Sequence, residues 1–400
     1  MTPSTLGTTL IGLGLLAALA SAALGGRRGR VAGRAAQAAA AALGLALAAL
    51  LGALLADRFE IAYVAAHASR ALPWWMRIAA LWAGQEGSLL LWAGLQAGLA
   101  LLVHRRAERS GEPLDRWAAT VLSLVAAFYT AILLTLANPF LAGDPGAVDG
   151  RGLNPLLRHA GMIVHPPALL AGYVAMAAPY AYAVAALVTG RFDAWTARAR
   201  RWTLVAWLLL GLGLLLGARW AYDVLGWGGY WGWNPVENSS LIPWIISIAL
   251  IHSMLLQKRK SVLKKTNIGL ALLYFVLVFY STFLTRSGIL SDFSVHSFQE
   301  SNLKIYLSIM LILLVIASLF IFLRHFRSIK SEPLKEELFN LDNMTVFGII
   351  VLLFYSFIIL AGTSMPILTG LTGKDPVPVT SNFYNNISVP MGIMILLFII

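Results

Sequence analysis

Long apolar segments alternate with short polar ones along the whole chain. Each apolar segment reaches about 18 residues, the length that an α-helix needs to cross a bilayer. We predict ten complete spans, at residues 6–24, 35–56, 78–103, 117–137, 162–188, 202–217, 239–256, 267–284, 303–323 and 345–360. An eleventh apolar segment begins near Ser388 and is cut off at Ile400. The predicted fold class is therefore an all-α polytopic membrane protein with about ten complete transmembrane helices and a partial eleventh.

The loops between the predicted spans alternate in positive charge. Five of them hold 21 of the 30 Lys and Arg residues: 27–34, 105–116, 191–201, 258–265 and 324–335. Such loops stay on the cytoplasmic side of a membrane. We therefore predict that the N-terminus lies outside. The loops that contain His296, lead to His165 and surround residue 230 then face the outer side as well.

Composition agrees with a membrane location and narrows the chemistry. Hydrophobic residues make up 59% of the chain and charged residues only 12%, against about a quarter charged in a soluble protein. The net charge of +12 sits mostly in short loops, so we expect no nucleic-acid partner. Cysteine is absent. Any reacting thiol must therefore come from another molecule.

One segment, residues 227–244, combines four tryptophans and a tyrosine with three glycines and two prolines. Its glycines and prolines argue against a lipid-facing helix, because a broken helix would leave backbone polar groups unsatisfied in hydrocarbon. Aromatic rings on a glycine-rich backbone form a flat apolar surface with indole N–H donors at its edge. We call residues 227–244 the Trp-rich segment. We expect it to hold a large planar ligand, with haem as the leading candidate.

Three histidines are placed to bind haem iron, since neutral imidazole is a good iron ligand. His165 precedes two prolines, which bias it to extended backbone at the start of a span; an ordinary interfacial helix start fits equally well. His296 lies in an apolar outer loop. His252 lies deep within a predicted span, where an ionisable residue is a functional candidate, although a bond to a neighbouring helix would also explain it. Arg286 and Arg219 are the nearest outer-side cations, and one of them would suit a haem propionate.

The remaining histidines have simpler interpretations. His104 and His325 flank basic loops, so we predict that both are solvated. His67 and His159 lie in outer loops, where surface placement is the expectation.

The Trp-rich segment resembles the WWD signature of haem-handling membrane proteins, and the chain as a whole resembles the CcmF-type haem lyase subunits of cytochrome c maturation. Three further stretches are similar to segments of that family: residues 84–92, 153–167 and 283–296. The usual Asp of the signature is Asn234 here, with Glu237 as an acidic neighbour. The resemblance covers residues 1–400 as a single haem-handling domain, with the outer-side WWD-type region at residues 219–244. We expect the family's C-terminal region to be missing.

The resemblance implies roles for matching positions. His165 and His296 would be the axial ligands of a haem held on Trp227, Trp231, Trp233 and Trp244, with Asn234, Glu237 and Arg286 as secondary contacts. His252 would be one ligand of a resident haem b, whose second ligand belongs to the missing region. The reaction would be thioether formation between haem, as substrate, and the two cysteines of a CxxCH motif in apocytochrome c. The implied partners are a haem chaperone, the apocytochrome and other maturation subunits, at the outer face of a bacterial inner membrane.

Two other classes of protein compete with the lyase. A haem exporter or carrier would move haem to the Trp-rich segment without ligating it. An ion-translocating subunit would use ionisable residues within the spans, for which Glu86 and His252 are the candidates.

Overall fold

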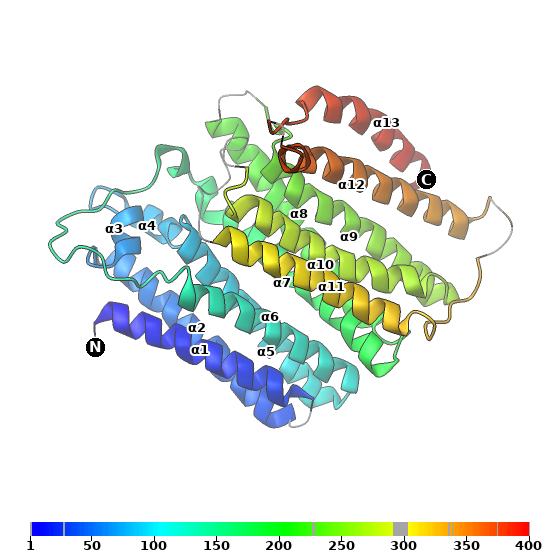
Figure 1. Ribbon diagram of the computed structural model, residues 1–400, viewed down its shortest axis with the longest axis horizontal. Helices are drawn as coiled ribbons and strands as arrows, with labels where there is room; N and C mark the ends of the chain where they lie inside the picture. Colours follow the sequence, from blue (N-terminus) through cyan, green and yellow to red (C-terminus); the bar gives the residue numbers. More distant parts are fainter. Residues whose placement is uncertain are drawn as a thin grey trace. The chain divides into compact units, whose positions relative to one another are not determined.

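The computed structural model describes residues 2–26, 29–225, 229–290, 303–334, 337, 339–373 and 375–399 (Figure 1). Ten of its helices are long and apolar enough to cross a membrane, and they match the ten predicted spans one to one. They are α1 (Pro3–Gly25), α2 (Gly29–Leu55), α5 (Gln85–Ser110), α6 (Pro113–Thr135), α7 (Gly161–Thr189), α8 (Thr196–Val224), α9 (Pro235–Lys260), α10 (Lys264–Arg286), α11 (Leu303–His325) and α12 (Leu341–Leu371). The prediction of an all-α, multi-pass membrane protein is confirmed.

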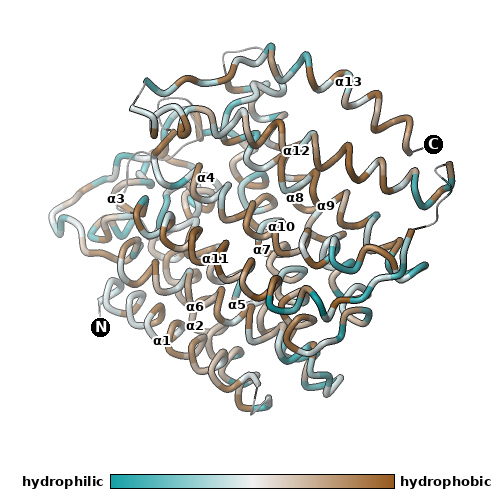
Figure 2. Tube along the Cα trace, turned by 45° about the vertical axis from the view of Figure 1, so that its right-hand side comes forward, coloured by the Kyte–Doolittle hydropathy of each residue, from teal (hydrophilic) through white to brown (hydrophobic). Residues whose placement is uncertain are grey.

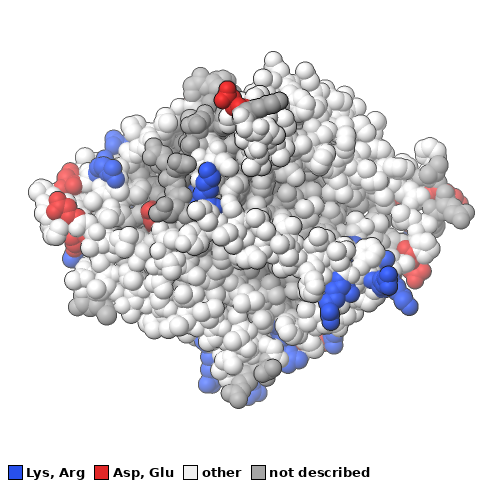
Figure 3. Space-filling model, in the orientation of Figure 1, with Lys and Arg blue, Asp and Glu red and all other residues white. Residues whose placement is uncertain are grey.

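Four shorter elements complete the described part of the chain. They are α3 (Ala62–His67), α4 (Trp74–Ala80), the 3-10 helix η1 (Pro155–Leu157) and α13 (Ser381–Ile399). The helices are hydrophobic along their middle turns and more hydrophilic near their ends, as Figure 2 shows. Lys and Arg side chains gather toward the helix ends, where loops begin (Figure 3).

Most predicted boundaries differ from the structure by one to seven residues, and the end of α12 differs by eleven, at Leu371 against residue 360. Two further differences concern an interrupted span and the last helix. The span predicted at 78–103 is interrupted between α4 and α5, because Gly84 has extended backbone and caps the start of α5. Tyr63 holds this break: its hydroxyl donates to the Ala80 carbonyl at 2.8 Å and accepts from the Gly84 N–H at 3.1 Å. The eleventh segment begins as a helix at Ser381 rather than near Ser388.

The chain divides into two compact units, and the division falls within α7 and α8. The first unit comprises Met1–Ala181 and Leu215–Gly226, and the second comprises Tyr182–Leu214 and Trp227–Ile400.

In the first unit α1, α2, α5 and α6 form a closed bundle (Figure 1). Helices α1 and α5 each pack against both α2 and α6. Trp92 of α5 stacks on Tyr129 of α6, with ring centroids 4.8 Å apart, and on Tyr173 of α7 at 5.7 Å. Large rings of this kind bury about 150–250 Å² each and so contribute strongly to packing.

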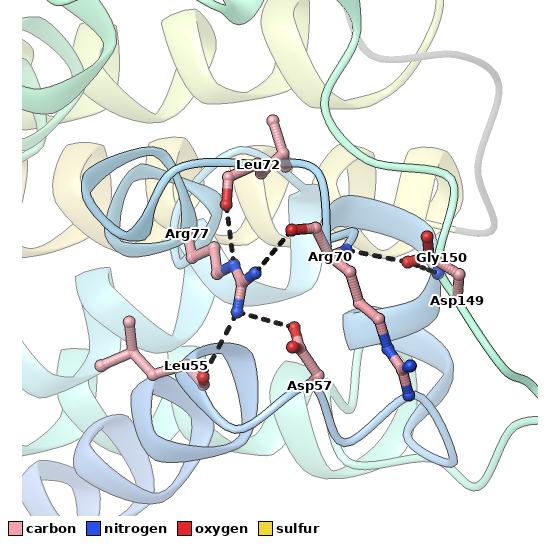
Figure 4. Close-up of polar contacts among 7 residues, drawn as sticks. All are labelled: Leu55, Asp57, Arg70, Leu72, Arg77, Asp149 and Gly150. Atoms are coloured by element: carbon pink, nitrogen blue, oxygen red, sulfur yellow. Dashed lines mark hydrogen bonds and ion pairs between the residues drawn. The ribbon is translucent and has the colours of Figure 1, made fainter.

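The loops at one end of this bundle are tied together by a single guanidinium group (Figure 4). Arg77 of α4 donates to the carbonyls of Leu72 and Arg70, at 3.0 Å each, and pairs with Asp57 at 2.8 Å. Asp149 accepts hydrogen bonds from the backbone N–H groups of Arg70 and Gly150. These bonds lower the pKa of Asp149 below its usual value. The loops on either side of α3 are thus tied to α4, and Asp149 ties the loop before α4 to the segment that follows α6.

In the second unit α9 packs between α10 and α12, while α11 packs on α10 and α13 packs on α12. One face of α11 is exposed and wholly apolar, with Ile309, Ile312, Ile316 and Phe320 each more than half exposed. A surface of this composition is suited to contact with lipid chains.

Candidate functional site

The Trp-rich segment has two structural parts. Residues 229–234 are irregular, and α9 begins at Pro235, so that Trp244 lies within a helix. The prediction of an irregular segment therefore holds only as far as Asn234. Proline at the first helical position is favourable, because the N–H that it lacks would have no partner there. Trp227 lies outside the described residues. We call residues 229–234 the aromatic turn.

Trp233 is the most constrained residue of the aromatic turn. Its φ of 56° places it in the left-handed region, which costs energy for a residue other than glycine and therefore needs support from its surroundings. That support comes from α13. The Trp233 indole stacks on Tyr384, with centroids 5.1 Å apart and planes 12° apart, and its Nε1 donates to Asn385 Oδ1 at 2.7 Å.

Two further contacts complete the turn. Ser381 Oγ donates to the Gly232 carbonyl at 3.2 Å. Trp231 meets Trp233 edge to face at 5.9 Å. The Nε1 of Trp231 is buried and has no acceptor within the part of the chain that the structure describes. A cavity of about 230 Å³ adjoins the turn, lined by residues of the turn, α12 and α13.

Asn234 and Glu237 form the capping box of α9. Asn234 Oδ1 accepts from the N–H groups of Val236 and Glu237, at 3.0 Å each. The Glu237 carboxylate in turn accepts from the N–H groups of Gly232, at 2.9 Å, and Asn234, at 3.2 Å. An aspartate at position 234 would accept the same two bonds, because either side chain is a good N-cap. The departure from the signature at this position therefore preserves the geometry of the turn.

Trp244 contacts α8 rather than the aromatic turn. Its Nε1 donates to the Trp207 carbonyl at 3.1 Å, and the two indoles stack 5.9 Å apart. Both residues belong to the second unit. Trp231, Trp233, Asn234 and Glu237 are brought together, whereas Trp244 stabilises the packing of α8 on α9.

His165 lies within α7, so the prediction of extended backbone at this residue is wrong. Helix α7 begins at Gly161 and continues through Pro166 and Pro167. A proline inside a helix removes the N–H that would bond the carbonyl four residues earlier. For Pro166 that carbonyl belongs to Met162, and it accepts instead from Trp82 Nε1 at 2.7 Å. A side chain from the break between α4 and α5 thus replaces the missing backbone donor.

The ring of His165 is held by α8. It stacks on Trp220, with centroids 6.3 Å apart and planes 18° apart. Gly217 permits this approach, since a Cβ added there would lie 2.5 Å from His165 Cε1. These residues all belong to the first unit.

A series of polar contacts joins α8 to the start of α7, the helix that contains His165. Asp223 pairs with Arg219 at 2.9 Å and lies 3.8 Å from His159 Nε2. His159 Nδ1 in turn accepts from the Gly161 N–H at 3.1 Å, at the start of α7. Arg219, one of the two cations expected near haem, thus has a carboxylate partner within its own helix. Arg286, the other, is buried in the last turn of α10.

His252 lies within a span, as predicted, whereas His104 lies in an environment opposite to the one expected. His252 is exposed on α9, and its Nδ1 bonds the Ile248 carbonyl at 2.8 Å. Because a carbonyl only accepts, Nδ1 is the nitrogen that carries the proton in this bond, and in the neutral ring the Nε2 lone pair is then available to a metal. The prediction that His104 is solvated is wrong: the ring is buried, and its Nε2 bonds Ser21 at 2.9 Å and Ser123 at 3.1 Å. His296 lies outside the described residues.

Sequence reasoning missed the contribution of α13. Tyr384 and Asn385 lie about 150 residues from the tryptophan that they hold, and no local motif links them to it. One signal was present. Residues 381–386 are mostly polar, an unusual composition at the start of an otherwise apolar helix.

The fold and the aromatic turn define a multi-pass helical membrane protein with a rigid tryptophan-bearing turn at the start of one span. Residues 82–291 match the model of the cytochrome c assembly protein family. This match spans both the His165 helix and the Trp-rich segment. The chain belongs to the cytochrome c assembly protein family.

Individual relatives agree with this assignment. The chain is 37% identical over 340 residues to the cytochrome c-type biogenesis protein CcmF of Pseudomonas aeruginosa, covering 84% of this chain and 51% of that protein. It is 36% identical over 352 residues to the probable cytochrome c-type biogenesis protein NrfE of Escherichia coli K12, covering 86% and 62%. A solved structure of the cytochrome c haem lyase CcmF matches with a TM-score of 0.79 and 29% identity, over 100% of this chain and 61% of that one. The chain therefore spans between 51% and 62% of the length of these proteins.

Proposed function

We propose that the chain is a haem lyase subunit of cytochrome c biogenesis, acting as an enzyme within a multi-subunit complex. The observation that carries the proposal is the family match over residues 82–291, which includes the Trp-rich segment and His165. The similarity to the solved haem lyase supports it over the full length of this chain.

In this proposal the aromatic turn positions haem as substrate. Trp231 and Trp233 are half-buried, Tyr230 is 52% exposed, and the contacts from α13 keep the turn in one conformation. A preformed apolar surface orients a flat ligand without an ordering cost during the reaction. The buried Trp231 N–H, which has no acceptor among the described residues, is a donor suited to a propionate.

We assign the axial positions on this haem to His165 and His296. For His165, the Trp220 stack and the absence of a side chain at Gly217 fix the plane of the imidazole. A fixed ring lowers the entropy lost when iron is bound, and it sets the orientation of the haem relative to the incoming thiols. The chain itself supplies no thiol, since it contains no cysteine. Both thioether sulfurs would come from the CxxCH motif of the apocytochrome.

His252 is suited to hold a resident haem b. The Nδ1–H bond to Ile248 fixes the tautomer and directs the Nε2 lone pair away from the helix, as in other histidine metal sites. A haem bound there would supply electron transfer to the substrate haem iron. The contribution of this chain is the neutral, oriented imidazole on the exposed face of α9.

We place the aromatic turn on the outer, periplasmic side of a bacterial inner membrane. The support is the charge of the alternate loops, which assigns the basic ends of the helices to the cytoplasm. The partners in this proposal are a haem chaperone, apocytochrome c and further maturation subunits.

The test is co-expression with a CxxCH apocytochrome and the partner subunits, followed by haem staining of the denatured product. We expect covalent cytochrome with the wild-type chain and loss of it with His165→Ala or His296→Ala. His325→Ala, at a basic helix end, is the matched control and should leave attachment intact. Purified protein should show a Soret band that His165→Ala weakens. Haem binding without attachment would instead support a carrier, and no histidine-dependent Soret band would overturn both.

A further inference from the structure

The first unit contains a hollow at the basic ends of its four bundled helices. It has a volume of about 520 Å³ and is lined by the end of α1, the start of α2, the end of α5 and the start of α6. Binding sites for small ligands commonly have volumes of about 300–1,000 Å³. The charged and titratable residues of the lining are Arg30, Arg34, Arg105, Arg116, Glu108 and His104.

Within the described part of the chain, the positive charge of this hollow is only partly balanced. Arg30 and Arg34 lie one turn apart on α2, while Arg105 and Arg116 come from α5 and α6. None of the four forms an ion pair with any residue in the described ranges. Arg106, next to Arg105, differs: it pairs with the buried Asp115 at 3.3 Å. Only Glu108 opposes the four arginines within the lining.

Two of these arginines also lie where they destabilise their own helices. Arg30 is in the first turn of α2, which has no acidic residue in that turn. Arg116 is the fourth residue of α6. The start of a helix carries a partial positive charge, so basic residues there are unfavourable by a few tenths of a kcal/mol each. An anion in the hollow would be attracted by the start of α2 and by the guanidinium groups, whereas the start of α6 already holds Glu112 and Asp115.

The surroundings favour a lipid over a soluble anion. Val31 and Trp117, each one residue from a lining arginine, are 48% and 37% exposed. Leu102 is 55% exposed and lines a second hollow that shares Arg105. Exposed aliphatic side chains and an interfacial tryptophan are the surface that acyl chains contact beside a headgroup.

We propose that this hollow binds the phosphate group of an anionic membrane phospholipid. Arg34 and Arg105 would contact the phosphate oxygens, and Val31, Leu102 and Trp117 would contact the acyl chains. Guanidinium groups bind phosphate through paired N–H donors, and basic pockets between membrane helices are suited to acidic headgroups. This proposal is independent of the haem lyase activity proposed above.

The test is native mass spectrometry of the purified protein, delipidated in detergent and titrated with phosphatidylglycerol or phosphatidylcholine. We expect a saturable phosphatidylglycerol adduct with little phosphatidylcholine retained. Each of Arg34→Gln and Arg105→Gln should weaken the adduct about fivefold, given roughly 1 kcal/mol for each basic residue near an acidic lipid. Glu108→Gln should strengthen it, because the opposing carboxylate is removed.

Arg201→Gln is the matched control, since Arg201 is an exposed arginine near the start of α8, in another basic segment of the chain. It should leave the adduct unchanged. The proposal is overturned if Arg201→Gln weakens binding as much as the pocket variants do, or if the two lipids bind equally. Thermal unfolding, followed by tryptophan fluorescence, gives a further test. If inorganic phosphate alone stabilises the folded protein as much as phosphatidylglycerol does, the proposal that the ligand is a lipid is overturned.

Discussion

The carbonyl of Met162 would have no donor within the His165 helix, because Pro166 lacks the backbone N–H that would bond it. Trp82→Phe keeps a smaller aromatic ring and removes the indole N–H that bonds this carbonyl at 2.7 Å. A buried acceptor without its partner costs about 1–3 kcal/mol, so we expect a lower midpoint of thermal unfolding, measured by circular dichroism. Trp117→Phe is the control, because that indole is partly exposed. Equal midpoints for the two variants would contradict the role of Trp82.

Gly217 is a second single-residue determinant of the His165 site. In Gly217→Ala the new Cβ would lie 2.5 Å from His165 Cε1, so the imidazole must leave its stack on Trp220. Overpacking of this kind costs about 1–3 kcal/mol. We expect a reduced unfolding midpoint and a weaker Soret band.

Gly12→Ala serves as the comparison for this substitution. No atom lies within 4 Å of the Cβ position at Gly12, and alanine is favoured over glycine in a helix by up to about 1 kcal/mol. A Gly217→Ala protein as stable as Gly12→Ala would show that the stack is not tightly packed.

Among the elements, α9 depends on its N-terminal cap. Asn234→Ala removes the acceptor of two backbone N–H groups, which typically costs about 1 kcal/mol. Asn234→Asp keeps that acceptor and restores the residue usual in the signature. We therefore expect Asn234→Asp to match wild type in both unfolding midpoint and haem attachment, with only Asn234→Ala impaired. Loss of attachment in Asn234→Asp would indicate a role for the amide beyond capping.

The short helix α3 should respond to pH through His67. Burial lowers the pKa of His67 from its ordinary value of 6.5, and Arg151 acts in the same direction, while the backbone bond to Tyr63 and the charge of Glu86 oppose it. The unfolded chain then binds a proton more readily than the folded one. The stability contributed by the neutral ring is complete above pH 6.5 and is lost as pH falls from there toward the lowered pKa.

Hydrogen exchange of residues 62–84 measures this effect. We expect faster exchange at pH 5.5 than the change in intrinsic rate explains, and a smaller pH dependence in His67→Gln. Ring stacking on Tyr63, 4.3 Å between centroids, is the contact that protonation would disturb. An unchanged pH dependence in His67→Gln would assign the effect to another group.

For the whole molecule, the predictable part of the structure follows from local hydrophobicity. Ten apolar segments lie where ten helices form, because each span satisfies its own backbone within a continuous stretch of sequence. The break before Gln85 was missed because it depends on Tyr63, a residue outside the span. His104 was misjudged for a similar reason, since its partners Ser21 and Ser123 come from two other helices.

The residues of the candidate site stay a prediction, and the structure bears on the geometry of those that it describes. Tryptophan and histidine in outer loops indicated haem chemistry. The separate roles of residues in the Trp-rich segment could not be predicted from the sequence. Asn234 and Glu237 cap a helix, while Trp244 packs on Trp207. These roles depend on where α9 begins and on what lies opposite it.

The contact between α13 and Trp233 sets a lower limit on the length of a working fragment. A version ending after α12, at Leu371, would retain all of residues 82–291 that match the family model. It would lack Ser381, Tyr384 and Asn385 and with them the side chains that hold the aromatic turn. Boundaries chosen for expression or crystallisation should therefore extend through α13, even though the family match alone would permit a shorter chain.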